Sequence, residues 1–346
     1  MNDSSVAEKS EAPGVAGAFL EVDHMIQRYK LPRAILEAVS DVTFSINKGE
    51  TLGLVGESGS GKSSVGRAIV QLPPPSLGSI RFDGAELTNM SKSELRYVRH
   101  RLQMIYQDPI SALNPRRKIR DIVGEGLTIA RVSKKEITER VNAMLELVGM
   151  EPNVFAERRA HQLSGGQCQR VAIARALIVE PELLICDEPV ASLDVSVQGQ
   201  ILNLLEEMRQ RYGLSMLFIS HDLSVIHAVS DNIGVMYLAK IVELGNADEV
   251  ANNPAHPYTR GLIDAVPIPD PDAPLPANKL RGEIASPLDP PSGCRFRTRC
   301  PYAQDRCANE VPVLRDVGGG QLVACHFPLH GGVAPQAIPV SIGAAT

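Results

Sequence analysis

The chain has 346 residues, a length that predicts about two domains. It is 44% hydrophobic and 22% charged, which is ordinary for a globular protein and excludes a disordered or fibrous chain. The formal net charge of −5 argues against a nucleic-acid binder that relies on a basic surface. No apolar run reaches the roughly 18 residues of a membrane-spanning helix, and the polar N-terminus lacks a secretory signal. We therefore expect a cytosolic protein.

The first part of the chain combines a polar segment with strand-like segments. Residues 1–16 are rich in Ser, Glu, Gly and Ala without periodicity, so we expect a disordered leader there. Strands are expected at 19–28 and 38–46, where apolar residues recur along the chain. A short apolar run over Thr51–Val55 predicts a further strand.

A glycine-rich loop follows this last strand. It has the spacing G-x-x-x-x-G-K-S and consists of Gly56, Glu57, Ser58, Gly59, Ser60, Gly61, Lys62, Ser63 and Ser64. Glycines let successive N–H groups turn toward a phosphate, and the helix-like segment that follows adds the positive end of its dipole. Lys62 would supply a charge for the β- and γ-phosphates, and Ser63 a hydroxyl ligand for Mg²⁺. The flanking strand and helix favour a nucleotide site over a chance glycine turn.

A charged, helix-like stretch comes next and predicts a helical subdomain at about 91–170. Its charged residues have the spacing of a solvent-exposed helix face. Its apolar residues have the spacing of a single core-facing stripe, and they are Ile137, Val141, Met144, Leu145 and Val148.

Two carboxylates end the next strand-like run, at 182–188. An acid at the carboxyl end of a core strand lies where an α/β sheet meets its ligand. Asp187 would then hold Mg²⁺ through water, and Glu188 would orient or activate the attacking water. A solvated acidic pair at a strand end is the alternative for these two residues taken alone.

A second glycine motif lies between the phosphate loop and the acidic strand. It consists of Leu163, Ser164, Gly165, Gly166 and Gln167, followed by an Ala-rich helix-like segment at 170–177. This motif resembles the signature of the ABC-type ATPases, and the resemblance covers about 19–261. It implies an α/β P-loop nucleotide-binding domain with an antiparallel β lobe and a helical subdomain. In that family the signature meets the γ-phosphate bound by the other subunit, so the resemblance also implies a head-to-tail dimer.

The same resemblance implies roles for four single residues. Tyr29 corresponds to the aromatic residue that stacks on adenine, and Gln107 to the glutamine that reaches Mg²⁺ and the attacking water. Asp194 corresponds to the loop that contacts the other subunit, and His221 to the switch histidine at the γ-phosphate. The implied catalytic residues are Glu188 and His221, and the implied Mg²⁺ ligands are Ser63, Gln107 and Asp187.

The last quarter of the chain is rich in proline and cysteine. Of the 25 prolines in the whole chain, 15 lie between residues 254 and 339, which predicts extended segments and turns there. Cys294, Cys300, Cys307 and Cys325 have the spacing C-x5-C-x6-C-x17-C. A cytosolic location disfavours disulfides, whereas four thiolates can bind Zn²⁺ or an iron–sulfur cluster. Four free thiols are the remaining alternative.

Three segments, 106–116, 256–260 and 292–326, resemble the ATPases of oligopeptide, dipeptide and nickel importers, most closely the F-type subunit. The resemblance implies a nucleotide-binding domain at 17–262, a small Cys-rich extension at 263–335 and a tail at 336–346. It favours a [4Fe–4S] cluster over Zn²⁺ in the extension. It also implies that ATP hydrolysis drives peptide import, with nickel or another small solute as the alternative cargo. A soluble ABC ATPase of repair or translation is the alternative from a different class.

The implied partners are a second related ATPase subunit, two transmembrane permeases and, indirectly, an extracellular substrate-binding protein. No nucleic-acid partner is expected. The resemblance therefore predicts a peripheral protein on the cytoplasmic face of the membrane.

Overall fold

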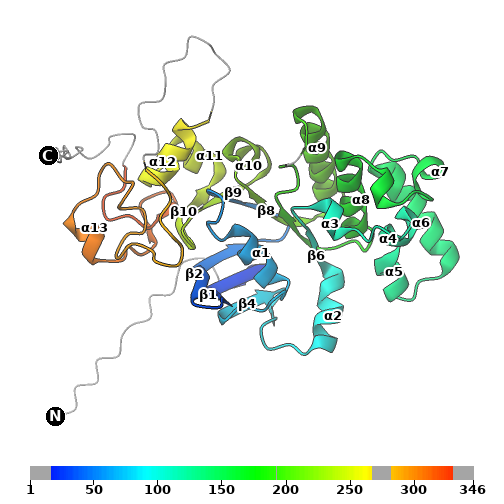
Figure 1. The fold of residues 1–346 in the computed structure, drawn as a ribbon, viewed down its shortest axis with the longest axis horizontal. Helices are drawn as coiled ribbons and strands as arrows, with labels where there is room; N and C mark the ends of the chain where they lie inside the picture. Colours follow the sequence, from blue (N-terminus) through cyan, green and yellow to red (C-terminus); the bar gives the residue numbers. More distant parts are fainter. Residues whose placement is uncertain (1–16, 192, 267–281, 330–346) are drawn as a thin grey trace, which may run out of the picture.

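A computed structural model describes residues 17–191, 193–266 and 282–329 (Figure 1). The predicted leader at 1–16 and the predicted tail at 336–346 lie outside these residues.

A four-stranded antiparallel sheet forms the lobe at the lower centre of Figure 1. Its strand order is β2 (Ile35–Ile46), β1 (Leu20–Lys30), β4 (Leu77–Phe82) and β5 (Ala85–Glu86). Leu20 lies opposite Ile46, and Val22 lies opposite Phe44. All four side chains are buried, because alternate residues of both strands share one face of the sheet. Strands β1 and β2 occupy the two segments that the sequence predicts.

A larger sheet carries the core of the molecule. Its order is β11 (Arg315–Asp316), β12 (Leu322–Val323), β10 (Lys240–Asn246), β9 (Asn232–Tyr237), β3 (Thr51–Val55), β8 (Ser215–Ser220), β7 (Leu183–Asp187) and β6 (Leu102–Ile105). The five strands from β9 to β6 run parallel. Every residue of β3, β7 and β8 is buried, as expected for central parallel strands covered on both faces.

Helices pack around the two sheets, on the left as well as on the right of Figure 1. They are α1 (Lys62–Ile69), α2 (Lys92–Arg101), α3 (Pro109–Ala112), α4 (Ile119–Val123), α5 (Glu125–Ile129), α6 (Lys134–Leu147), α7 (Pro152–Phe155), α8 (Gly165–Leu177), α9 (Val195–Tyr212), α10 (Leu223–Val229), α11 (Ala247–Asn252), α12 (Pro257–Asp264) and α13 (Asp305–Asn309). Val141, Met144 and Leu145 of α6 are buried, which confirms the predicted apolar stripe. Of the helices in the described ranges, none has the length and apolarity to cross a bilayer.

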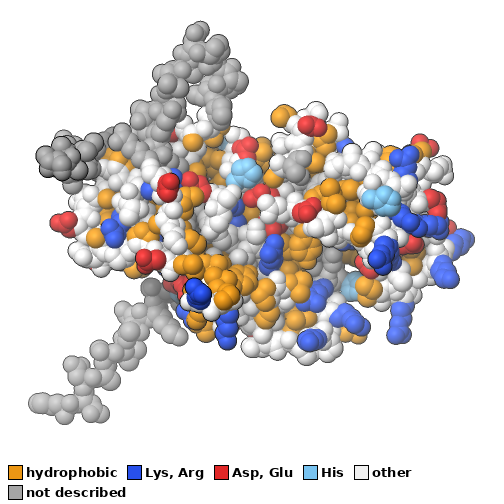
Figure 2. Space-filling view, viewed as in Figure 1, with side chains coloured by type: hydrophobic (Ala, Val, Ile, Leu, Met, Phe, Trp, Pro, Cys, Tyr) orange, Lys and Arg blue, Asp and Glu red, His pale blue; other side chains and the backbone are white. Residues whose placement is uncertain are grey.

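The surface charge is unevenly distributed although the net charge is small. Figure 2 shows Lys and Arg side chains gathered on the right of this face, where Figure 1 places helices α4 to α7. The chain as a whole nevertheless carries a formal net charge of −5.

The C-terminal segment 282–329 adds two strands to the larger sheet. Strand β12 pairs antiparallel with β10, and Glu243 lies opposite Val323. The carboxylate of Glu243 is buried and accepts a hydrogen bond from Gln321 Nε2 at 2.7 Å. Phe296 is buried in the same hydrophobic core as Tyr237 and the parallel strands. The segment therefore shares a core with the parallel strands.

Candidate nucleotide site

The predicted site residues gather at the carboxyl ends of the parallel strands. Strand β3 leads into the glycine-rich loop, and β7 ends at Asp187. His221 follows β8 directly, and Gln107 comes two residues after β6. Because parallel strands end at one edge of the sheet, residues from four distant parts of the sequence lie together there.

Two glycines of the loop occupy positions that no other residue fits. Gly61 has a φ of 106°, in the region that side chains disfavour, and a Cβ there would meet the carbonyl oxygen of Ala38 at 2.2 Å. A Cβ on Gly56 would meet the carbonyl oxygen of Met236 at 2.1 Å. The loop therefore needs glycine at both positions to curl against its neighbours.

Lys62 begins helix α1 and is buried inside this loop. Its ammonium donates hydrogen bonds to the carbonyl oxygens of Gly56 at 2.6 Å and Glu57 at 3.0 Å. Burial lowers the pKa of Lys62, while the charges of Glu188, Asp187 and Glu57 act in the opposite direction. The loop thus holds a cation at its centre, where a phosphate would be bound.

Asp187 and Ser63 form a pair of oxygen ligands beside the loop. The Ser63 hydroxyl donates to Asp187 Oδ1 at 2.7 Å. The other carboxylate oxygen, Oδ2, is buried and has no hydrogen-bond partner among the described residues. Burial raises the pKa of Asp187, and the Ser63 hydroxyl opposes this shift. A buried, unpartnered carboxylate oxygen next to a hydroxyl fits Mg²⁺, which prefers hard oxygen ligands.

Glu188 is contacted by two other predicted site residues, Gln107 and His221. Gln107 Nε2 donates to its carboxylate at 3.1 Å, and His221 Nδ1 lies 3.5 Å from the same oxygen. Its φ is 48°, a backbone conformation that costs roughly 1–3 kcal/mol outside glycine and concentrates at functional sites. The Glu188 N–H is anchored on the carbonyl of Ile219 at 2.9 Å, which ties this conformation to strand β8.

Tyr29 and the remaining residues of the phosphate loop lie close to Lys62 and the start of helix α1. Tyr29, at the end of β1, places its hydroxyl 3.5 Å from the Ser64 Oγ, so its ring lies beside the start of α1. Ser60 Oγ receives a hydrogen bond from Lys62 at 3.3 Å. Ser58 and Gly59 complete the turn between the strand and the helix.

The signature motif and Asp194 lie away from the phosphate loop of the same chain. Ser164 caps α8: its Oγ accepts from the Gln167 N–H at 3.3 Å, and Gln167 Oε1 accepts from the Ser164 N–H at 3.0 Å. Figure 1 places α8 among the helices on the right and α1 near the antiparallel sheet. Asp194 is exposed at the start of α9 and makes no side-chain cap. One chain therefore does not bring these residues to its own loop.

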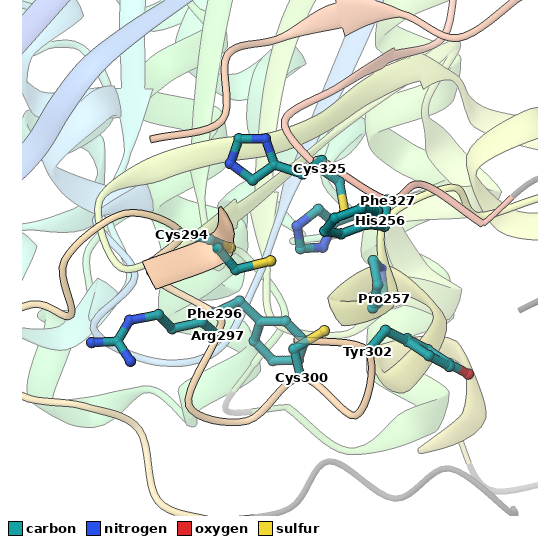
Figure 3. A pocket seen from close by; sticks show the side chains of 11 residues that line it. His256, Pro257, Cys294, Phe296, Arg297, Cys300, Tyr302, Cys325 and Phe327 are labelled. Atoms are coloured by element: carbon teal, nitrogen blue, oxygen red, sulfur yellow. The ribbon is translucent and has the colours of Figure 1, made fainter. Parts of the chain in front are cut away.

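The four cysteines of the extension line one narrow pocket of about 10 Å³, room for roughly one water molecule. Figure 3 shows the sulfur atoms of Cys294, Cys300 and Cys325 around this pocket. Burial raises the pKa of Cys294, and it raises the pKa of Cys300 and Cys325 to about 12. Within the described ranges no three His, Cys, Asp or Glu side chains are placed to hold a metal ion. The predicted convergence of the four cysteines is present, but not in the geometry of a metal site.

Comparison with known proteins places the chain in a family. Residues 39–191 match the ABC transporter family, and residues 242–307 match the family "Oligopeptide/dipeptide transporter, C-terminal region". The oligopeptide transport ATP-binding protein OppF of Escherichia coli is 53% identical over 289 residues, which cover 82% of this chain and 86% of that protein. The chain belongs to the ABC transporter ATPases. OppF of Haemophilus influenzae is 46% identical over 321 residues, covering 88% of this chain and 96% of that protein.

Solved structures share the fold of this ABC ATPase. The dimeric ATP-binding cassette MJ0796, in a post-hydrolysis state with ADP and phosphate, is 27% identical with a TM-score of 0.62, covering 66% of this chain and 98% of that one. CbiO1 of Clostridium perfringens, part of the ABC transporter complex CbiONQ, is 30% identical with a TM-score of 0.60. The match covers 68% of this chain and 92% of that one. The prediction of an ABC-type nucleotide-binding fold is confirmed, and the chain is an ATPase of this family.

Two residues that the sequence analysis did not assign also contact the phosphate loop. The Tyr258 hydroxyl accepts a hydrogen bond from the Glu57 N–H at 2.9 Å across 201 residues. Arg299 donates to the Glu57 carboxylate at 2.6 Å across 242 residues. Neither contact has a local sequence signal, since each depends on how the C-terminal segment packs on the domain.

Proposed function

We propose that this ATPase is the motor subunit of a membrane importer for peptides. The convergence of Gln107 and His221 on Glu188 beside the phosphate loop supports ATP hydrolysis by this site. The match of 242–307 to the oligopeptide/dipeptide C-terminal region, and relatives named OppF, support peptides as the cargo.

The chain's own residues divide the chemistry between them. The loop amides and Lys62 hold the β- and γ-phosphates, and Tyr29 stacks on the adenine. Ser63, Asp187 and Gln107 would hold Mg²⁺, whose charge would offset that of the phosphates. Glu188 orients the attacking water and accepts its proton. His221, within reach of Glu188, donates a hydrogen bond to the γ-phosphate and stabilises the charge that develops there.

The separation of the two halves of the site supports an assembly of two ATPase subunits. The exposed Ser164 cap leaves N–H groups at the start of α8 available for a phosphate. In a head-to-tail dimer these groups face the loop of a second, related ATPase subunit, and Asp194 contacts the same partner. This chain takes the F-type position, on the cytoplasmic face of two permeases that receive peptide from an extracellular binding protein. Closure of the dimer drives the permeases.

Reconstitution in vesicles tests this function. Co-expressed with two permeases and a second ATPase subunit of an oligopeptide importer, the chain is expected to copurify with them and to support ATP-dependent uptake of a labelled oligopeptide. Uptake of nickel without peptide would assign the alternative cargo and contradict the proposed one. Copurification with ribosomes or DNA, and not with permeases, would contradict transport altogether.

The extension is proposed to hold a [4Fe–4S] cluster on Cys294, Cys300, Cys307 and Cys325. The convergence of the four free thiols on one pocket supports this proposal. Because the pocket is narrow, binding requires the thiols to move outward and to lose their protons. A cluster would then link four separate points of a segment that has little regular structure.

Anaerobic purification tests the cluster directly. Iron and acid-labile sulfide are expected in equal amounts with visible charge-transfer absorption, and Cys300→Ser is expected to abolish both. Cys168→Ser is the matched control, because Cys168 is a buried thiol of helix α8 outside the extension. Stoichiometric zinc, or full iron content in Cys300→Ser, would contradict the cluster.

A further inference from the structure

The second residue of the phosphate loop, Glu57, has its side chain bound by the extension. Two nitrogens of the Arg299 guanidinium donate to the two carboxylate oxygens of Glu57, at 2.6 Å and 3.0 Å. The Arg299 side chain is only 5% exposed and that of Glu57 is 24% exposed, so water screens the pair weakly. A two-point contact of this kind fixes orientation as well as charge, which a lysine cannot reproduce.

The backbone of Glu57 is held from the same side. Its N–H donates to the hydroxyl of Tyr258, in helix α12, at 2.9 Å, so this amide is already engaged. Tyr258 is fully buried, and its ring centroid lies 4.7 Å from that of Tyr237 and 5.3 Å from that of Phe296. The Arg299 guanidinium lies 5.8 Å from the Tyr237 centroid. One aromatic cluster therefore supports both contacts to Glu57.

The carbonyl group of Glu57 contacts Lys62, the cation of the site. Its carbonyl oxygen accepts the hydrogen bond from Lys62 Nζ at 3.0 Å. The carboxylate, carbonyl and amide of Glu57 thus connect Arg299, Lys62 and Tyr258. Without Arg299 the carboxylate would be an uncompensated negative charge beside the place where phosphates bind, and the first turn of the loop would lose its outer support.

We propose that Arg299 is a positioning residue for the phosphate loop: by neutralising and orienting Glu57, it lets the cysteine-bearing extension set the affinity of the nucleotide domain for ATP. This inference rests on the proposed role of residues 56–64 in binding phosphates. It gives Glu57 the role of an anchor for the loop, with no direct phosphate contact. Because Cys300 follows Arg299 directly, a rearrangement at the cysteine pocket would move Arg299 and, through its pair with Glu57, the loop.

Titration of the full-length chain with MgATP, by calorimetry, tests the inference. Arg299→Met removes the charge and keeps the length of the side chain, and we expect the dissociation constant to rise about tenfold. Arg306→Met is the control, since Arg306 has an exposed side chain in helix α13 of the same extension and pairs with Glu310, just after the helix, at 2.7 Å. It is expected to bind MgATP as the parent does.

A second substitution separates positioning from a purely structural role. Glu57→Gln removes the unpaired carboxylate, so in the Arg299→Met background it is expected to restore most of the affinity. Parent-like affinity in Arg299→Met, or no recovery in the double variant, would overturn the inference. If Arg299→Met does not fold, as judged by thermal unfolding, Arg299→Gln, which is also neutral, takes its place with the same two outcomes. Lys62→Ala, measured alongside, is expected to bind weakly; if it binds as the parent does, the proposed nucleotide site fails instead.

Discussion

Replacing Glu188 by glutamine is expected to lower ATP turnover of the assembled transporter by about 10²- to 10⁴-fold, the usual contribution of a general base. Glutamine has nearly the same shape as glutamate, so it fits beside Gln107 and His221 at the end of strand β7. It cannot accept a proton from the attacking water. Nucleotide binding is expected to persist, because the phosphate loop and Lys62 are unchanged. Steady-state phosphate release and MgATP titration measure the two effects separately.

The control for this variant is Glu182→Gln, at the opposite end of the same strand. Glu182 pairs with Arg101, with 3.1 Å between its Oε2 and the Arg101 Nη2, and lies at the edge of the sheet that faces away from the loop. Its loss removes a surface ion pair and leaves turnover intact. Turnover near the parental rate in Glu188→Gln would contradict the assignment of the base and would direct attention to His221.

Replacing Lys62 by alanine is expected to weaken MgATP binding about 10- to 150-fold, which corresponds to the roughly 1.5–3 kcal/mol of a charge-assisted hydrogen bond. The ammonium is buried within the loop and engaged by three of its oxygens, so water does not replace it readily. Its removal also takes one donor from each of those oxygens, although the Glu57 carbonyl keeps the hydrogen bond from the Ser60 N–H at 3.2 Å. The variant is measured by calorimetry, together with its unfolding temperature.

Lys135→Ala serves as the comparison for Lys62→Ala. The Lys135 side chain is 89% exposed on helix α6, and its ammonium lies 4.0 Å from the Glu139 carboxylate. An exposed pair of this kind contributes little to stability, and it lies outside the site. Equal losses of affinity in the two variants would show that total charge, and not the position of Lys62, controls binding.

The local elements of this site could be predicted from the sequence because each depends on adjacent residues. The loop at 56–61 needs glycines for its own backbone conformation, and Lys62 follows at the start of the helix that the loop creates. The acids at the end of β7 follow a run whose continuous apolar character indicates a buried parallel strand. The cap at Ser164 is likewise formed by residues three apart.

Contacts between residues far apart in the sequence were decided by the tertiary structure alone. The strand order places the ends of β6, β7 and β8 side by side, which brings Gln107 and His221 to Glu188. The pairing of β12 with β10 brings the extension onto the nucleotide domain, and Arg299 onto Glu57. The spacing of four cysteines predicts a shared site, but the directions of their side chains depend on packing around Phe296. A motif specifies its own backbone, whereas a partner hundreds of residues away is selected only when the whole core is packed.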